Sequence, residues 1–136
     1  MRQPTTEFTI AFDGGTSPGG NGYGSWSIEW NGFKKLISRA KFTQAGFGLW
    51  ITNNVAEYLA LIRAVEWLGS VKDKKDYTVK IIGDSQLVLR TLTGRYQTHK
   101  PHLIPLRDKC RRMLAEFRGY TAIWQPRKHN VRRFGH

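Results

Sequence analysis

Two short apolar runs, each ending at an aspartate next to glycine, constrain the fold of this chain most strongly. Residues 7–15 (EFTIAFDGG) alternate apolar and polar side chains up to Asp13, and residues 77–84 (YTVKIIGD) end on a Gly-Asp pair. Such runs are typical of strands, and the glycines indicate where a strand stops. We therefore predict two strands that end at Asp13 and at Asp84.

The segments between and after these strands have the spacing of helices. Over residues 55–68, apolar residues recur every three or four positions, which predicts an amphipathic helix ended by Gly69. A short helix is predicted over residues 85–94, and a helix with a basic outer side over residues 103–117. A strand, a helix and a second strand in this order indicate a parallel crossover.

Further strands lie on either side of this unit. The dipeptide Asn31-Gly32 is a strong hairpin signal between residues 24–30 and 33–42, so the chain should begin with three antiparallel strands. A last strand is predicted over residues 120–126, and the final ten residues are polar and cationic, with no predicted element. The sum is an α/β fold with a mixed sheet covered by helices.

Composition narrows the functional classes. The 136 residues fit a single domain, 1–136, and the formal charge of +12 would attract a polyanion, whether RNA, DNA or an acidic membrane surface. The single Cys110 excludes an intramolecular disulfide framework. No apolar run is long enough to span a membrane and the N-terminus lacks the apolar region of a signal peptide, so we expect a cytoplasmic protein.

Three acids are candidates for chemistry. Asp13 and Asp84 each end a predicted strand, and they would project from adjacent strand ends if the two strands are neighbours. Glu57 lies in the first turn of the long helix. A helix that crosses this edge of the sheet can bring Glu57 next to the two aspartates. Hard divalent cations take oxygen ligands of this kind. The spacing therefore favours a metal site.

Each acid also has a structural alternative. Asp13 can serve as an ordinary turn residue before two glycines. Glu57 can be the third residue of a capping box in which Asn54 is the N-cap. Asp84 can cap the helix that follows it. Only the three acids together favour a metal site.

The chain resembles the type 1 ribonuclease H family in three segments, each with one of these acids. The segments are IAFDGGTSPGGNGYGSW, TNNVAEYLALIRAV and IIGDSQLVLRTLTG. Their order and spacing are similar to the acidic motifs of that family, and the resemblance extends over residues 9–130. It implies a five-stranded mixed sheet in the order 3-2-1-4-5, with helices on both faces.

The resemblance also implies an activity. A member of this family is a metal-dependent endonuclease that hydrolyses the RNA strand of RNA·DNA hybrids to 5′-phosphate and 3′-hydroxyl products. Asp13, Glu57 and Asp84 would be the catalytic ligands of two Mg²⁺ or Mn²⁺ ions, which activate the attacking water and stabilise the leaving oxygen. The partner would be the hybrid alone, bound by a monomer, with no membrane or protein partner.

The same resemblance places residues on the substrate. Asn53, Asn54 and Gln86 would contact the hybrid, partly through the RNA 2′-hydroxyls, and Gly14 and Gly15 would let the backbone approach closely. Cations are available for the phosphates of the DNA strand. The candidates are Arg90, Arg95, Lys100, Arg107, Arg111 and Arg112.

The chain departs from the family at a fourth acid. The family has an aspartate four residues after an asparagine that matches Asn130, but here that position is Phe134, and no acid follows Glu116. The chain also ends at His136, where the family continues into a C-terminal helix, so we expect that helix to be missing. In one interpretation, Asn130 or His136 supplies a neutral fourth ligand, and Mn²⁺ then supports more activity than Mg²⁺.

Other interpretations of this departure stay open. The chain can be a catalytically weak or inactive module that binds hybrids, or a natural C-terminal part has been lost. A DNA nuclease of the same superfamily is a further alternative, which the Asn-Asn pair before Glu57 disfavours. The retention of three clustered acids favours the enzyme, because a binder of phosphates has no use for them.

Overall fold

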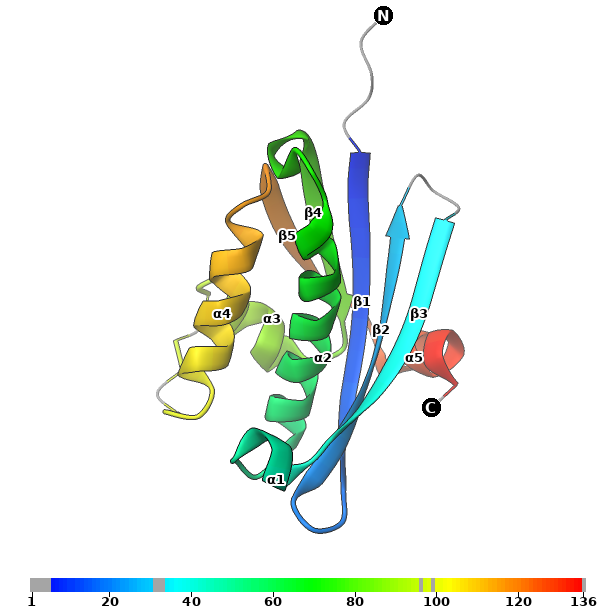
Figure 1. Ribbon diagram of the computed structural model, residues 1–136. Coiled ribbons are helices and arrows are strands. Elements are labelled where there is room, and N and C mark those ends of the chain that lie inside the picture. The colour runs from blue at the N-terminus through cyan, green and yellow to red at the C-terminus, as the bar shows by residue number, and fades with distance from the viewer. Residues whose placement is uncertain (1–5, 31–33, 96, 99, 136) are drawn as a thin grey trace, which may run out of the picture.

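One five-stranded sheet organises the molecule (Figure 1). The computed structural model describes residues 6–30, 34–95, 97–98 and 100–135. The strands are β1 (Thr6–Ser17), β2 (Asn21–Trp30), β3 (Lys34–Phe42), β4 (Tyr77–Gly83) and β5 (Gly119–Trp124). Their order is β3-β2-β1-β4-β5; β1, β2 and β3 pair antiparallel, whereas β4 and β5 run parallel to β1. The predicted mixed sheet and its order 3-2-1-4-5 are confirmed.

Helices cover both faces of this sheet. They are α1 (Gln44–Phe47), α2 (Asn53–Trp67), α3 (Gln86–Leu92), α4 (Ile104–Leu114) and α5 (Arg127–Phe134), with 3₁₀ turns η1 (Leu68–Ser70) and η2 (Lys74–Asp76). Ile10 and Phe12 of β1 point into the main core with α2, whereas Ala11 between them packs with Phe134 of α5. Since alternate residues of a strand face opposite sides, α2 and α5 lie on opposite faces.

Strand β1 is longer than the sequence predicted. Its parallel pairing with β4 ends at Ala11, but its antiparallel pairing with β2 continues to Ser17. The glycines after Asp13 therefore lie inside a strand and not in a loop. The hairpin that joins β2 and β3 has the predicted pairing, while its turn, Asn31-Gly32, lies outside the described residues.

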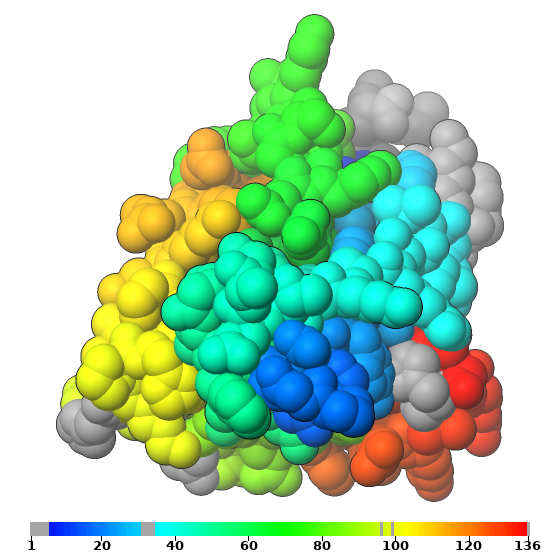
Figure 2. Space-filling model, turned by 60° about the horizontal axis from the view of Figure 1, so that its bottom comes forward, coloured from blue at the N-terminus to red at the C-terminus, as the bar shows by residue number. Residues whose placement is uncertain are grey.

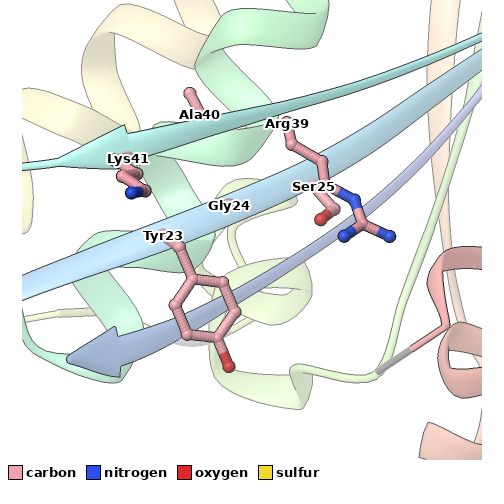
Figure 3. Close-up of a pocket in the computed structure, with 6 residues that line it drawn as sticks. All are labelled: Tyr23, Gly24, Ser25, Arg39, Ala40 and Lys41. Carbon is pink, nitrogen blue, oxygen red and sulfur yellow. The ribbon is translucent and has the colours of Figure 1, made fainter.

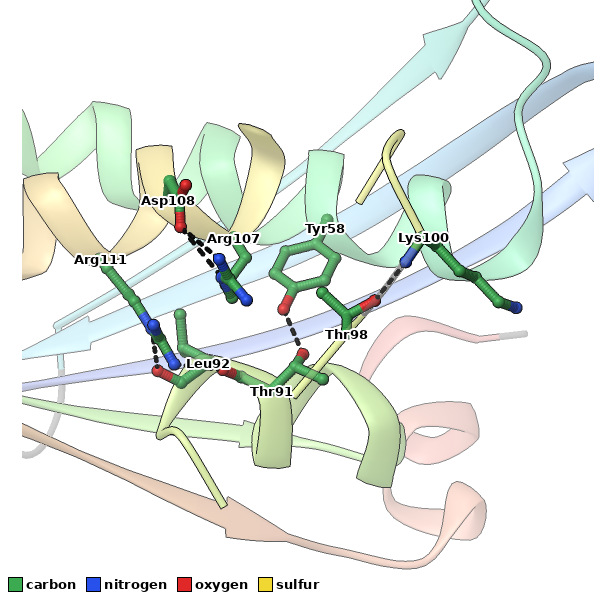
Figure 4. Close-up of polar contacts among 8 residues, drawn as sticks. All are labelled: Tyr58, Thr91, Leu92, Thr98, Lys100, Arg107, Asp108 and Arg111. Carbon is green, nitrogen blue, oxygen red and sulfur yellow. Dashed lines mark hydrogen bonds and ion pairs between the residues drawn. The ribbon is translucent and has the colours of Figure 1, made fainter. Parts of the chain in front are cut away.

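Polar contacts fix α3 between α2 and α4 (Figure 4). The Tyr58 hydroxyl of α2 is hydrogen-bonded to the Thr91 hydroxyl of α3 inside the core. Arg111 of α4 donates to the carbonyl oxygens of Thr91 and Leu92, over 2.7 Å and 3.0 Å. These contacts satisfy the last turn of α3 and hold the segment that follows β4 in place.

The C-terminal segment corrects one prediction. The polar and cationic stretch forms α5, eight residues long, so the expectation that a C-terminal helix is missing does not hold for Arg127–Phe134. Phe134 is 2% exposed and packs on Ala11 and Ile82. The Arg39 guanidinium donates a hydrogen bond to the Phe134 carbonyl oxygen. No helix among the described segments is long and apolar enough to cross a membrane.

Candidate active site

Asp13 and Asp84 meet at the edge where β1 and β4 separate. The parallel pairing of these strands ends at Ala11 and Ile82. Asp13 follows two residues later within β1, and Asp84 comes directly after the last residue of β4. The Trp124 indole nitrogen at the end of β5 donates to the Asp84 carbonyl oxygen over 3.1 Å. Both aspartates therefore lie just beyond the point where the parallel pairing of β1 and β4 ends, at the edge where ligands bind in open α/β sheets.

Glu57 comes to this edge on α2. Thr52 is the N-cap of the helix, and its hydroxyl accepts a hydrogen bond from the Val55 amide over 3.3 Å. The interpretation of Asn54 as N-cap, with Glu57 in a capping box, is therefore wrong. Glu57 lies two residues too far into the helix for that role, and its carboxylate can serve another purpose.

The helix that follows Asp84 is also capped by a hydroxyl residue and not by the acid. Ser85 is the N-cap of α3, and its hydroxyl accepts from the Val88 amide over 3.2 Å. The alternative that Asp84 caps this helix is therefore wrong. Thr52 and Ser85 do the capping, so neither neighbouring acid is needed for it.

Gly14 allows α2 to approach β1. A Cβ atom at this position would lie 2.5 Å from the Ala56 carbonyl carbon and 2.5 Å from the Glu57 amide nitrogen. Real Cβ atoms do not approach backbone so closely, so any side chain here would push the helix away. The glycine that the sequence analysis assigned to substrate contact thus has a structural role, because it brings Glu57 to Asp13.

The three carboxylates form one cluster. One oxygen from each of Asp13, Glu57 and Asp84 lies within 4.8 Å of the others. Glu57 Oε2 is buried and has no hydrogen-bond partner among the described residues. Burial raises the pKa of Glu57 from 4.5 to about 7, aided by the charges of Asp84 and Asp13, although a hydrogen bond from Ser85 opposes the shift. A divalent cation would satisfy the unpaired oxygen and offset the repulsion, so the donor set fits a metal.

An open, polar pocket of about 220 Å³ contains this cluster, and we call it the carboxylate pocket. It is lined by Asp13, Gly14, Gly15, Thr16, Tyr23, Asn53, Glu57, Asp84 and Arg127. Sequence reasoning missed Thr16, Tyr23 and Arg127. The sequence carries no motif that identifies Arg127 as a site residue, because only the position of α5 brings this cation to the acids.

Only one of the two predicted fourth ligands, Asn130, lies among the described residues. Asn130 is 2% exposed, and its amide nitrogen donates to the Phe12 carbonyl oxygen over 3.2 Å. Its amide oxygen accepts from Arg133 over 3.0 Å. Asn130 thus joins α5 to β1, and it does not line the carboxylate pocket. His136 lies outside the described residues.

The predicted substrate residues divide into two groups. Gly14, Gly15 and Asn53 line the carboxylate pocket. Asn54 is half-buried on the first turn of α2, and Gln86 is exposed at the start of α3; neither lines the pocket. All five nevertheless belong to the strand and the two helix starts that carry the acids.

The end of the β1–β2 hairpin supports the start of α2. Figure 2 shows this hairpin end, in blue, next to the segment that leads into α2, with α5 on one side and α4 on the other. The Gly20 carbonyl oxygen accepts from the Ile51 amide over 2.9 Å, and Asn21 Oδ1 accepts from the Gln44 amide over 2.9 Å. These bonds hold the residues before Asn53 against the hairpin.

Comparison with known proteins relates this geometry to known domains. The sequence matches the family model described as Reverse transcriptase-like over residues 28–132. It is 30% identical over 133 residues to the bifunctional protein Rv2228c of Mycobacterium tuberculosis, covering 90% of this chain and 32% of that protein. It is 40% identical over 81 residues to ribonuclease HI of Halobacterium salinarum, covering 60% of this chain and 39% of that protein. The chain therefore spans well under half the length of these relatives.

A solved structure agrees in fold. LC11-RNase H1, in complex with an RNA/DNA hybrid, superimposes with a TM-score of 0.77 at 31% sequence identity. The similarity covers 92% of this chain and 89% of that chain. The mixed sheet and its helices are therefore the fold of a known group of nucleic-acid enzymes.

Proposed function

Because the chain belongs to the type 1 ribonuclease H family, we propose that it is a metal-dependent endonuclease that hydrolyses the RNA strand of RNA·DNA hybrids. One observation carries this proposal. Three carboxylates that have no capping role meet within 4.8 Å in an open pocket, with one buried oxygen of Glu57 unsatisfied. The RNA/DNA hybrid in the complex of LC11-RNase H1 supports the choice of substrate.

Asp13, Glu57 and Asp84 would hold the metal, and we propose two ions, Mg²⁺ or Mn²⁺. When bound, the metal would activate the attacking water and stabilise charge on the leaving 3′-oxygen, which gives 5′-phosphate and 3′-hydroxyl products. Burial raises the pKa of Glu57 to about 7, so this carboxyl would have to give up its proton to bind a metal, and metal binding should strengthen as pH rises. Ser85 orients the Glu57 carboxyl through its hydroxyl.

Residues around the carboxylates would position the RNA strand. Asn53 at the start of α2 and Gly15 on β1 line the pocket, where they can reach the 2′-hydroxyls that distinguish RNA from DNA. Asn54 and Gln86 extend this surface along the two helix starts. Arg127 supplies a cation that can pair with a phosphate next to the scissile bond.

We propose that Mn²⁺ supports more activity than Mg²⁺. A fourth carboxylate is missing from the sequence after Glu116, and Asn130 uses both ends of its amide in other hydrogen bonds. A site with three carboxylates leaves more of the coordination sphere to water and substrate. Because Mg²⁺ demands near-ideal octahedral geometry whereas larger cations accept more varied geometry, we expect the change in the ligand set to weaken Mg²⁺ binding more than Mn²⁺ binding.

The test is cleavage of an end-labelled RNA·DNA hybrid beside matched RNA·RNA and DNA·DNA duplexes, in Mg²⁺ and in Mn²⁺. The proposal predicts metal-dependent cutting of the RNA strand of the hybrid alone, faster in Mn²⁺. Equal cutting of RNA·RNA would contradict the substrate, and equal or higher activity in Mg²⁺ would contradict the metal preference.

A second candidate function rests on the missing fourth acid. A chain with three carboxylates can be an inactive module that binds hybrids, because the second ion would then be held weakly. Tight binding of the hybrid with no cutting in either metal would favour this alternative over the enzyme.

A further inference from the structure

The face of β2 and β3 that points away from α2 is partly open. Gly24, Trp26 and Ile28 of β2 point towards α2 and the main core. The residues between them, with their partners on β3, lie on the opposite face. The register pairs Tyr23 with Lys41 and Ser25 with Arg39. Figure 3 shows these four side chains on one side of the two strands.

These residues line a second pocket, of about 450 Å³, which we call the open-face pocket. Its lining is Tyr23, Gly24, Ser25, Arg39, Ala40 and Lys41. Two of the six are cations, one is an aromatic ring, and none is acidic. This set combines a flat apolar surface with positive charge, which suits an unpaired nucleotide.

Tyr23 joins the two pockets. It lines both the carboxylate pocket and the open-face pocket, and 38% of its surface is exposed. Its ring lies over Gly15, since a Cβ atom there would be 2.5 Å from the Tyr23 ring carbon that carries the hydroxyl. A nucleic-acid strand that passes over the carboxylate pocket would therefore reach the open-face pocket next, on the other side of this ring.

The two cations can both face a ligand. Arg39 uses one guanidinium nitrogen to donate to the Phe134 carbonyl oxygen, and the remaining N–H groups of its five can bind a phosphate. Lys41 is exposed two residues along the same strand and lies on the same face. Together they offer one positive group that is hydrogen-bonded to the backbone and one that is exposed, both beside the Tyr23 ring.

We infer that the open-face pocket binds an unpaired nucleotide of the RNA strand that passes through the carboxylate pocket. The base would lie on the Tyr23 ring, and the adjoining phosphate would contact Arg39 and Lys41. This inference rests on the proposed function. It assigns the RNA strand and not the DNA strand, because the pocket adjoins the carboxylates through Tyr23.

The experiment compares the dissociation constants of hybrids with and without unpaired ends. Fluorescence anisotropy with the Asp13→Asn protein, which should bind without cutting, would use a blunt hybrid and hybrids with short RNA overhangs at the 5′ or 3′ end. A hybrid with a DNA overhang is the substrate control. We expect an RNA overhang of one polarity to tighten binding roughly fivefold or more, and a DNA overhang to have little effect.

The decisive variant is Lys41→Ala in the same Asp13→Asn background. It should reduce the gain in affinity from the RNA overhang to about twofold or less. It should also lower the slope of the logarithm of the binding constant against the logarithm of the salt concentration by about one, the loss of about one phosphate contact. Lys72→Ala is the matched control, because Lys72 is an exposed lysine in the connection before β4 and lines neither pocket. It should keep the full gain.

The outcomes separate the two claims. If the blunt hybrid is not bound at all, the proposed function fails. If the blunt hybrid is bound but an RNA overhang of either polarity adds nothing, or adds as much in Lys41→Ala as in the control, the inference about the open-face pocket is overturned while the proposed function stands.

Discussion

The β1–α2–β4 side of the carboxylate pocket and the α5 side differ in how they use polar side chains. On the first side, the hydroxyls of Thr52 and Ser85 cap the helices, and the neighbouring acids take no part in capping. On the second side, Asn130 spends both ends of its amide on the Phe12 carbonyl oxygen and on Arg133. One side presents carboxylates, whereas the other presents a cation and a packed helix.

This difference shows what allows a polar residue to bind a ligand. Glu57 and Asp84 reach the pocket because another residue has satisfied the backbone next to them. Asn130 matches the family motif in sequence, but the backbone of β1 and the side chain of Arg133 have already satisfied it. A side chain that is needed to hold two elements together is a poor metal ligand, because binding would break those bonds.

The largest expected effect is on the first side, at Asp13. Asp13→Asn keeps the size of the side chain but removes its charge, and metal sites lose several kcal/mol of charge stabilisation in this way. We expect the rate of hybrid cleavage to fall by at least about 1,000-fold with little change in melting temperature. Activity within tenfold of the wild type would show that Asp13 is not a ligand.

Gly14→Ala should have the next largest effect, because it moves the Glu57 carboxylate without removing it. The new Cβ atom would lie 2.5 Å from the backbone of Ala56 and Glu57, so α2 must shift. We expect a loss of activity of roughly 100-fold, since small misplacements of catalytic groups cost about that much, and a loss of about 1–3 kcal/mol in stability.

The chain offers a matched control for this change. A Cβ atom added at Gly69, after α2, would meet nothing within 4 Å beyond its own chain neighbours, so Gly69→Ala should leave both activity and stability near the wild-type values. Activity of Gly14→Ala equal to that of Gly69→Ala would contradict the structural role of Gly14.

Arg127→Ala tests the contribution of the α5 side. Arg127 lines the carboxylate pocket, and the loss of a charged contact to phosphate should raise KM about tenfold with a smaller change in kcat. Lys128→Ala is the control, because Lys128 is the next residue of α5, is exposed, and does not line the pocket. If the two variants change KM equally, Arg127 contributes only a general surface charge and no specific contact with the substrate.

A separate effect is expected on the stability of the metal-free protein and not on its activity. Burial raises the pKa of Glu57 from 4.5 to about 7, so the folded state holds this proton more tightly than the unfolded state. The free energy of unfolding should therefore fall as pH rises from about 4.5 to about 7, by at most about 3 kcal/mol. Urea unfolding in a chelator should show that Glu57→Gln removes this fall. Parallel pH profiles for the two proteins would contradict it.

Most of the carboxylate side could be predicted from sequence. The strand ends, the helical spacing and the three acids at fixed distances along the chain are local signals, and together with the family resemblance they led to the correct strand order. The error in the predicted strands there was to end β1 at Asp13. Gly14 and Gly15 resemble turn residues in sequence, but they remain in the strand because β2 pairs with it as far as Ser17 and α2 lies against it.

The α5 side could not be predicted in the same way. Its segment is rich in cations and has few apolar residues, so its hydrophobic pattern predicts no helix. The helix depends on distant contacts: Phe134 packs on Ala11 and Ile82, and Asn130 bonds to the Phe12 carbonyl oxygen. These contacts place Arg127 beside the acids, and no sequence motif predicts them.

The most direct test of this contrast is the binding of Mn²⁺ measured by isothermal titration calorimetry. Wild-type protein, Glu57→Gln and Asn130→Ala would be compared, after thermal melting has shown that each variant is folded. If the carboxylates form the metal site without α5, Asn130→Ala should bind Mn²⁺ within about threefold of the wild type, whereas Glu57→Gln should bind at least about tenfold more weakly. A folded Asn130→Ala protein that loses as much affinity as Glu57→Gln would contradict the account.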